Sequence, residues 1–167
     1  EIRKADCVLV IGVDPAETHP IIKNEIHLAI RRNRAQLIVL GSYDIGLNRA
    51  TQISPLSPSA ILLLGKPGEE VTLLNGIIQT ILREGLEDKV FIEERTEGID
   101  ELRRKQVEVK VEVERAAKAY ARSKRAMILI GSALGSPLDP KEVAIASSNL
   151  ALISGNLGRE SSGILLL

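Results

Sequence analysis

The sequence predicts an α/β fold, a three-layer sandwich in which helices cover both faces of a mainly parallel sheet. Short runs of aliphatic residues end at glycines, as strands buried on both faces do. Segments with apolar residues at helical spacing lie between these runs. Because strands and helices alternate along the chain, consecutive strands should run parallel, and 167 residues suit a single domain.

Four apolar runs have the length and composition of buried strands. They are residues 7–11, 36–40, 61–64 and 126–130. The glycines that directly follow them are Gly12, Gly41, Gly65 and Gly131, and a further apolar run occupies 164–167. Since ligands of parallel sheets collect at the carboxyl ends of the strands, the loops that begin at these glycines are the candidate binding region.

Four segments have the periodicity of amphipathic helices. They are residues 19–33, 67–84, 114–123 and 143–153. Glu69 and Glu70 stand in the first turn of the second helix, where negative charge is favourable, and Asp139-Pro140 supplies a cap and a first-turn proline for the last. Residues 89–94 should form one short helical turn. The alternating valines of 107–113 fit a one-sided strand, and the same run could begin a helix.

Composition excludes several classes of function. The 22 basic and 22 acidic side chains cancel, and only two tyrosines and one phenylalanine could stack on bases, so we expect no nucleic-acid partner. The single cysteine, Cys7, cannot form an internal disulfide or a cysteine-rich metal cluster, and we expect it to pack as a small apolar residue. No stretch approaches the roughly 20 apolar residues of a membrane-spanning helix.

Charge is unevenly distributed along the chain. Residues 1–82 carry 16 charges, residues 83–125 carry 23 and residues 126–167 carry 5, so the middle should be solvated and the end interior. The sequence opens on charged residues without an initiator Met. We therefore expect one α/β domain over 1–167 that is a fragment of a larger chain.

The loops contain no complete catalytic motif. Neither G-x-G-x-x-G after the first strand nor G-x-x-x-x-G-K-[ST] occurs, so the usual nicotinamide and ATP motifs are absent. There is no Ser-His-Asp arrangement, and His19 and His27 have no partner at metal-ligand spacing. We expect no catalytic residue and no metal ligand in this segment.

Four ordered blocks of the sequence resemble the molybdopterin oxidoreductase superfamily. That family includes formate dehydrogenases, nitrate reductases and the large iron–sulfur subunit of respiratory NADH:quinone oxidoreductase. The blocks are ADCVLVIGVDPAETHP at 5–20, KPGEEVTLLNG at 66–76, EGL at 84–86 followed by Phe91-Ile92, and NLALISGNLGR at 149–159. The resemblance implies a Rossmann-like sheet of the formate dehydrogenase/DMSO reductase type.

In catalytic members, the corresponding domain is implied to hold the guanosine and phosphate half of a molybdopterin guanine dinucleotide at the strand ends. The matching positions here are Gly12, Asp14, Glu17, His19, Gly41 and Glu70. For Asp14, Glu17 and His19, we favour an ordinary turn and helix start over a role as nucleotide ligands. Likewise, the loop over 155–163, with Asn156, could lie near the pterin or be only a helix cap and turn.

Three positions depart from the family pattern. Gly41-Ser42-Tyr43 replaces the family's Asp-Pro-Arg, Glu70 stands for the usual Asp, and Asp14 stands for the usual Asn. An unpaired anion a few ångströms from a phosphate is repulsive by ~1 kcal/mol or more. The departures therefore weaken the expected contacts to a nucleotide.

The end of the second strand favours one branch of the family. Leu-Gly-Ser followed by Asp44 and a long loop is similar to the large iron–sulfur subunit of NADH:quinone oxidoreductase. We therefore expect a structural or cofactor-pocket domain of that subunit, with no cofactor bound by these residues. Iron–sulfur clusters would lie elsewhere in the parent, which would be a cytoplasmic oxidoreductase at the inner face of the membrane. Its partners would be its own further domains and the other subunits of a respiratory complex. The alternative is the dinucleotide-binding domain of a formate dehydrogenase or related molybdoenzyme.

Overall fold

The computed structural model describes all residues except 43–44, 46, 48–59, 105–108 and 132–139. In this described part, five strands form one parallel sheet in the order β3-β2-β1-β4-β5. The strands are β1 (Cys7–Ile11), β2 (Gln36–Gly41), β3 (Ile61–Leu64), β4 (Ala126–Ile130) and β5 (Gly163–Leu166). The predicted fold class, α/β with a parallel sheet, is thereby confirmed.

The strand ends are level at both edges of the sheet. Cys7 lies opposite both Gln36 and Ala126, so the three central strands start together. We call this side, with residues 1–6, 34–35, 122–125 and 154–162, the amino edge. We call the opposite side, with residues 12–19, 41–42, 65–70 and 131, the carboxyl edge.

Backbone hydrogen bonds continue the sheet by one residue past the strand ends. The amide of Gly131 donates to the carbonyl of Ile11 at 3.0 Å, and the amide of Gly12 donates to that of Leu40 at 3.2 Å. The amide of Gly65 donates to the carbonyl of Gly41 at 3.1 Å. The four predicted glycines therefore lie side by side along the carboxyl edge.

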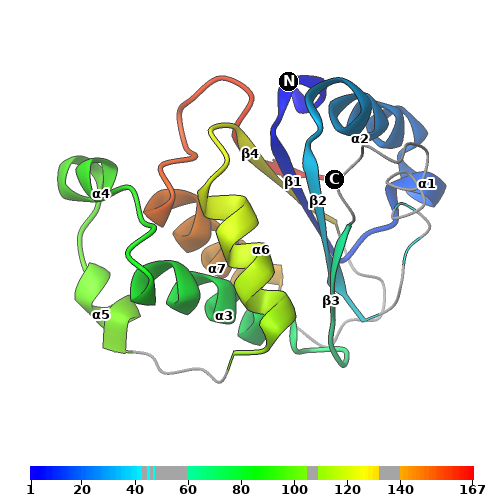
Figure 1. Cartoon of the computed structure of the whole chain (residues 1–167). Helices are drawn as coiled ribbons and strands as arrows, with labels where there is room; N and C mark the ends of the chain where they lie inside the picture. Colours follow the sequence, from blue (N-terminus) through cyan, green and yellow to red (C-terminus); the bar gives the residue numbers. More distant parts are fainter. Residues whose placement is uncertain (43–44, 46, 48–59, 105–108, 132–139) are drawn as a thin grey trace.

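Helices cover the two faces of the sheet unequally (Figure 1). One face packs against α3 (Glu70–Arg83), α6 (Val111–Ala121) and α7 (Pro140–Ile153), and the other against α2 (Pro20–Asn33). Alternate residues of each strand serve the two cores. Leu9 faces α3 and α6, whereas Val8 and Val10 face α2, and all three are buried. Burial on both faces explains why these strands consist of unbroken aliphatic runs.

Shorter helices complete the fold. They are η1 (Ile2–Lys4), α1 (Pro15–Thr18), α4 (Lys89–Arg95) and α5 (Ile99–Arg104). The last two connect α3 to α6 at the side of the molecule remote from the sheet (Figure 1). None of the helices in the described residues combines the length and apolarity that crossing a membrane requires.

The structure resolves two ambiguities of the sequence. The final apolar run is a fifth strand, β5, paired with β4. The strand alternative for 107–113 is wrong over 111–113, because α6 begins at Val111; residues 107 and 108 lie outside the described part. Val113 is 2% exposed, and a Cβ atom on Gly76 would lie 3.1 Å from its side chain. Close packing of α6 on α3 thus accounts for the helix.

Candidate functional site

The turn after β1 is built by a glycine and an aspartate. Gly12 has a φ angle of 63°, in the left-handed region that favours glycine. Asp14 then caps α1, and its Oδ1 accepts a hydrogen bond from the amide of Ala16 at 2.8 Å. The hydroxyl of Thr18 donates to the carbonyl of Asp14 at 3.0 Å. The carboxylate therefore has a structural role as a helix cap.

Glu17 and His19 follow on α1 and at its end. Glu17 is exposed, and His19 is half-buried with its Nδ1 2.8 Å from the Thr18 hydroxyl. The amide of His19 donates to the carbonyl of Pro15. His19 is also the residue before α2, a helix that starts at Pro20 without a side-chain cap.

The surface at the end of β2 is open and carries no charged side chain among the described residues. A Cβ atom placed on Gly41 would meet nothing within 4 Å, so the surface beside this residue is open. Ser42 is exposed, and Tyr43 and Asp44 lie outside the described residues. Gly41 therefore supplies no carboxylate where the pattern that the sequence resembles has an aspartate, and the position of that pattern's arginine, Tyr43, is outside the described residues.

The turn between β3 and α3 is closed by two glutamates. Oε2 of Glu69 accepts a hydrogen bond from the amide of Lys66 at 3.0 Å, and Oε2 of Glu70 accepts one from the amide of Gly68 at 2.9 Å. Glu70 is only 4% exposed, whereas Lys66 is exposed. The sequence placed Glu69 in a first helical turn, but its bond to the turn amide was not predicted.

The strand order reverses between β1 and β4, which is where ligands commonly enter such sheets. Here Val13 lies directly against Gly131, because a Cβ atom on Gly131 would be 2.3 Å from the Cβ of Val13. The contact leaves no room for any residue but glycine at 131. The residues that follow, 132–139, are outside the described part.

Taken together, the carboxyl edge is rich in acceptors. Its described acids are Asp14, Glu17, Glu69 and Glu70, whereas Lys66 is its single lysine or arginine. Carboxylates suit the N–H and O–H donors of a nucleoside. The amides of Ala16, Lys66 and Gly68, which could otherwise receive a phosphate, already donate to these acids. These acids and the three amides that they occupy therefore fit the nucleoside part of a nucleotide and do not fit its phosphates.

No metal site accompanies these residues. The described part of the chain holds no group of three His, Cys, Asp or Glu side chains placed to share an ion. Cys7 is completely buried at the start of β1, and desolvation raises the pKa of its thiol to about 12. The thiol therefore stays protonated and is not a nucleophile at neutral pH.

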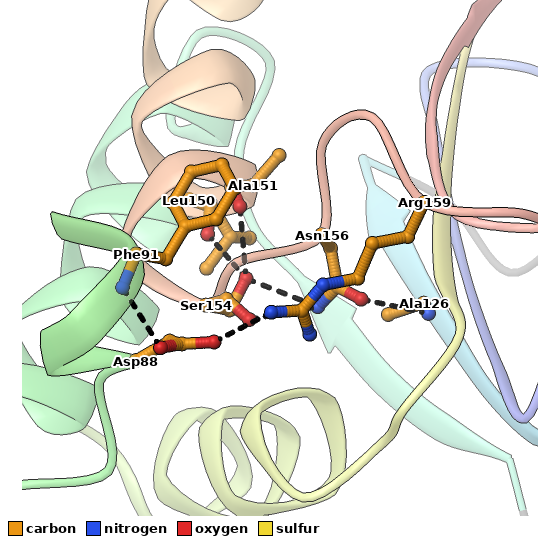
Figure 2. Close-up of polar contacts among 8 residues, drawn as sticks. All are labelled: Asp88, Phe91, Ala126, Leu150, Ala151, Ser154, Asn156 and Arg159. Carbon is orange, nitrogen blue, oxygen red and sulfur yellow. Dashed lines mark hydrogen bonds and ion pairs between the residues drawn. The ribbon is translucent and has the colours of Figure 1, made fainter. Parts of the chain in front are cut away.

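The loop before β5 lies at the opposite, amino edge (Figure 2). The amide of Ala126 donates to Oδ1 of Asn156 at 3.2 Å, and Nδ2 of Asn156 donates to the Ser154 hydroxyl at 3.1 Å. Gly155, with a φ angle of 65°, ends α7. The loop is therefore a helix cap and turn, far along the strands from the glycine turns of the carboxyl edge.

An ion pair extends this loop to α4. Nη2 of Arg159 lies 2.8 Å from Oδ2 of Asp88, whose other carboxylate oxygen accepts a hydrogen bond from the amide of Phe91 (Figure 2). The Arg159 guanidinium is also 5.9 Å from the centre of the Phe91 ring. The bond from the Phe91 amide, followed by the Arg159 charge, lowers the pKa of Asp88 below its ordinary value. The contacts tie the α3–α4 connection to the loop before β5.

Of the six residues predicted to line a nucleotide site, Gly12, Asp14, Gly41 and Glu70 lie in turns of the carboxyl edge. Glu17 and His19 stand one helical turn beyond Gly12. The described hydrogen bonds of Asp14 and Glu70 stay within their own turns and do not join the two side chains to each other. The structure thus places the six on one edge as separate groups.

Comparisons with known proteins match nearly the whole chain, and they point to one family. The family model described as molybdopterin oxidoreductase matches residues 1–166. Formate dehydrogenase H of Escherichia coli (strain K12) is 32% identical over 176 residues, which cover 98% of this chain and 23% of that protein. The F420-dependent formate dehydrogenase subunit alpha of Methanocaldococcus jannaschii is 32% identical over 178 residues, covering 98% and 25%.

A solved structure has the same fold. Acetylene hydratase from Pelobacter acetylenicus matches with a TM-score of 0.74 at 21% identity, over 96% of this chain and 23% of that one. The present chain spans about a quarter of the length of the curated relatives that it matches.

Proposed function

Because the chain belongs to the molybdopterin oxidoreductase family, we propose that it is an α/β domain of the large subunit of a formate dehydrogenase-type oxidoreductase. The observation that carries this proposal is the alignment of two formate dehydrogenase sequences, each at 32% identity, across 98% of the present one. Since those relatives are about four times longer, the parent protein would supply the catalytic groups, any iron–sulfur clusters and the contacts to other subunits.

The role of this domain would be to position a cofactor. A bound molybdopterin cofactor would supply the redox chemistry, and Gly12, Asp14, Glu17, His19, Gly41 and Glu70 would line its nucleoside end. The open surface beside Gly41 leaves room for a base or ribose. Glu70 is held by the Gly68 amide, so its acceptor oxygens are oriented before a ligand arrives.

A second candidate function is favoured by the strand ends themselves. Gly41-Ser42-Tyr43 lacks the acid and arginine of the family pattern, and the acids of the β3–α3 turn oppose a phosphate. Both features suit the large iron–sulfur subunit of an NADH:quinone oxidoreductase, in which this domain would be a scaffold for electron-carrying parts of the parent. That parent would be cytoplasmic and attached to the membrane through its complex.

Metal and pterin analysis of the full-length parent separates the two candidates. A formate dehydrogenase-type parent should contain molybdenum or tungsten in stoichiometric amount, release a fluorescent pterin on oxidation, and be reduced by formate. Protein from a host that cannot make molybdopterin provides the blank. Intact iron–sulfur clusters without molybdenum, tungsten or pterin would reject the first candidate and favour the second.

A further inference from the structure

We infer that the turn between β3 and α3 is closed to phosphate by the chain's own carboxylates, so that this turn contacts only the uncharged part of a nucleotide ligand. The inference rests on the proposed function in one respect, that the parent is a molybdopterin-family oxidoreductase. It concerns residues of this chain, and it holds for either candidate parent.

The first step is the position of the turn. It follows β3 at the carboxyl edge, and it leads into α3, a helix of 14 residues. Free amides at the start of such a helix, together with its dipole, normally favour an anion. Just before that helix, the amides of Lys66 and Gly68 would offer a phosphate two further donors.

The second step is that carboxylates already occupy these donors. Glu69 and Glu70 accept the amides of Lys66 and Gly68 at 3.0 and 2.9 Å, so each binds its donor at ordinary hydrogen-bond length. A phosphate oxygen would have to displace them. It would also meet two like charges, and each at about 4 Å weakens binding roughly fivefold even in water.

The backbone of the turn also accommodates the carboxylates of Glu69 and Glu70. Gly68 has a φ angle of 99°, a backbone conformation that would be strained for a residue with a side chain. A Cβ atom on Gly65 would lie 3.0 Å from Oε2 of Glu69, so glycine leaves the space into which that carboxylate folds. The two glycines thus accommodate the carboxylates rather than a ligand.

The neighbouring turn has the same chemistry. Asp14 accepts the amide of Ala16 at 2.8 Å, so an acid also fills the backbone donor after β1. Among the described residues of the carboxyl edge, only the exposed Lys66 carries a fixed positive charge against four acids. Any diphosphate that reaches these two turns would have to be held by other groups.

Binding of inorganic pyrophosphate to the full-length parent tests the inference. The protein is made in a host that produces no molybdopterin, so the edge is free of cofactor, and binding is followed by equilibrium dialysis. The wild type gives the reference for binding by other groups of the parent, to which this turn should add no site below roughly 1 mM. The double variant Glu69→Ala/Glu70→Ala, which frees both amides and removes both charges, should bind at least about tenfold more tightly.

A second variant keeps the shape of the turn. Glu69→Gln/Glu70→Gln removes the charges but leaves an oxygen that can accept each amide, so it should gain less than the alanine pair. The matched control is Glu93→Gln/Glu94→Gln, an adjacent exposed pair on α4, which should gain nothing. Circular dichroism and size exclusion verify that all the proteins are folded.

Three results would overturn the inference: pyrophosphate binding by the wild type as tight as by the alanine pair, no gain in either turn variant, or an equal gain in the control on α4. A failure of this inference can be told apart from a failure of the proposed function. Molybdenum and pterin are measured on protein from an ordinary host, so a parent rich in molybdenum can still have a closed turn, and a metal-free parent can have an open one.

Discussion

The bonds that connect neighbouring strands differ between the two edges of the sheet. At the amino edge, side chains distant in sequence connect the strand starts: Nη2 of Arg125 lies 2.7 Å from Oδ1 of Asp6, and the Ala126 amide donates to Asn156. At the carboxyl edge, the described bonds between strand ends are made by backbone alone. The acids of that edge bond two or three residues away in their own turns.

The side-chain bonds of the amino edge therefore stabilise the fold, whereas the carboxyl edge is available for binding. Long-range side-chain bonds add constraints between elements, so removing one should weaken the whole domain. Local bonds within a turn fix the shape and charge of that turn and contribute little to the packing of the sheet. Substitutions at the two edges should therefore differ in their effect on the free energy of unfolding.

The largest effect is expected at Asn156. Replacing it by alanine should lower the free energy of unfolding by about 3 kcal/mol, because the buried amide of Ala126 loses its partner and a cavity remains. Urea unfolding monitored by circular dichroism measures the change. Asn24→Ala, on the exposed side of α2, should stay within about 0.5 kcal/mol. A loss below about 1 kcal/mol at Asn156 would contradict the role given to the amino edge.

At the carboxyl edge, the tight contact between Val13 and Gly131 should also affect the free energy of unfolding. Gly131→Ala should cost about 2 kcal/mol, because the new methyl group would overlap Val13. In the double variant Val13→Gly/Gly131→Ala the overlap disappears, so part of the loss should be recovered. A double-mutant cycle should give a coupling above about 1 kcal/mol. Additive losses would mean that the two residues are not in the contact described.

A smaller, pH-dependent effect is expected at Asp88. Asp88→Ala removes the cap of α4 and the partner of Arg159, and should cost about 1 kcal/mol at pH 7. The folded-state pKa of Asp88 lies below the ordinary 3.8, so its carboxylate stabilises the fold above that pH, and this contribution is lost as the pH falls through the lowered pKa. The difference between the two proteins should therefore shrink as the pH falls below the ordinary pKa of 3.8 and through the lowered one. A difference independent of pH would show that the charge of Asp88 is irrelevant.

The smallest effects come from one substitution made at each edge. Asp6→Asn removes the charge that pairs with the half-exposed Arg125 and should cost roughly 0.5–1 kcal/mol, less in high salt. Asp14→Asn should change stability by less than about 0.5 kcal/mol, because asparagine caps a helix as well as aspartate does. Thermal unfolding at low and high ionic strength measures both. Equal losses at the two positions would remove the distinction between the edges.

Much of the molecule follows from local patterns in the sequence. The runs of Val, Leu and Ile that end at Gly12, Gly41 and Gly65 are strands, and Ile22, Ile26 and Ile30 have the spacing of the buried face of α2, whereas Ile21 is exposed. Such patterns are informative because a buried strand or helix face imposes its own period on the residues. The resemblance to the molybdopterin oxidoreductase family is likewise confirmed. The similarity found favours formate dehydrogenases over the NADH:quinone oxidoreductase subunit specifically.

Contacts between distant residues were decided by the tertiary structure. The valines of 107–113 fit two periods, and in the structure their end is helical and packs against Gly76 of α3. The same holds for Asn156, which belongs to the amino edge because α7 returns along the whole length of the strands before β5 begins. By itself, the sequence determined which segments become strands and helices, since that depends on neighbouring residues. Which edge each turn joins, and which amides its acids occupy, depends on how those segments pack in three dimensions.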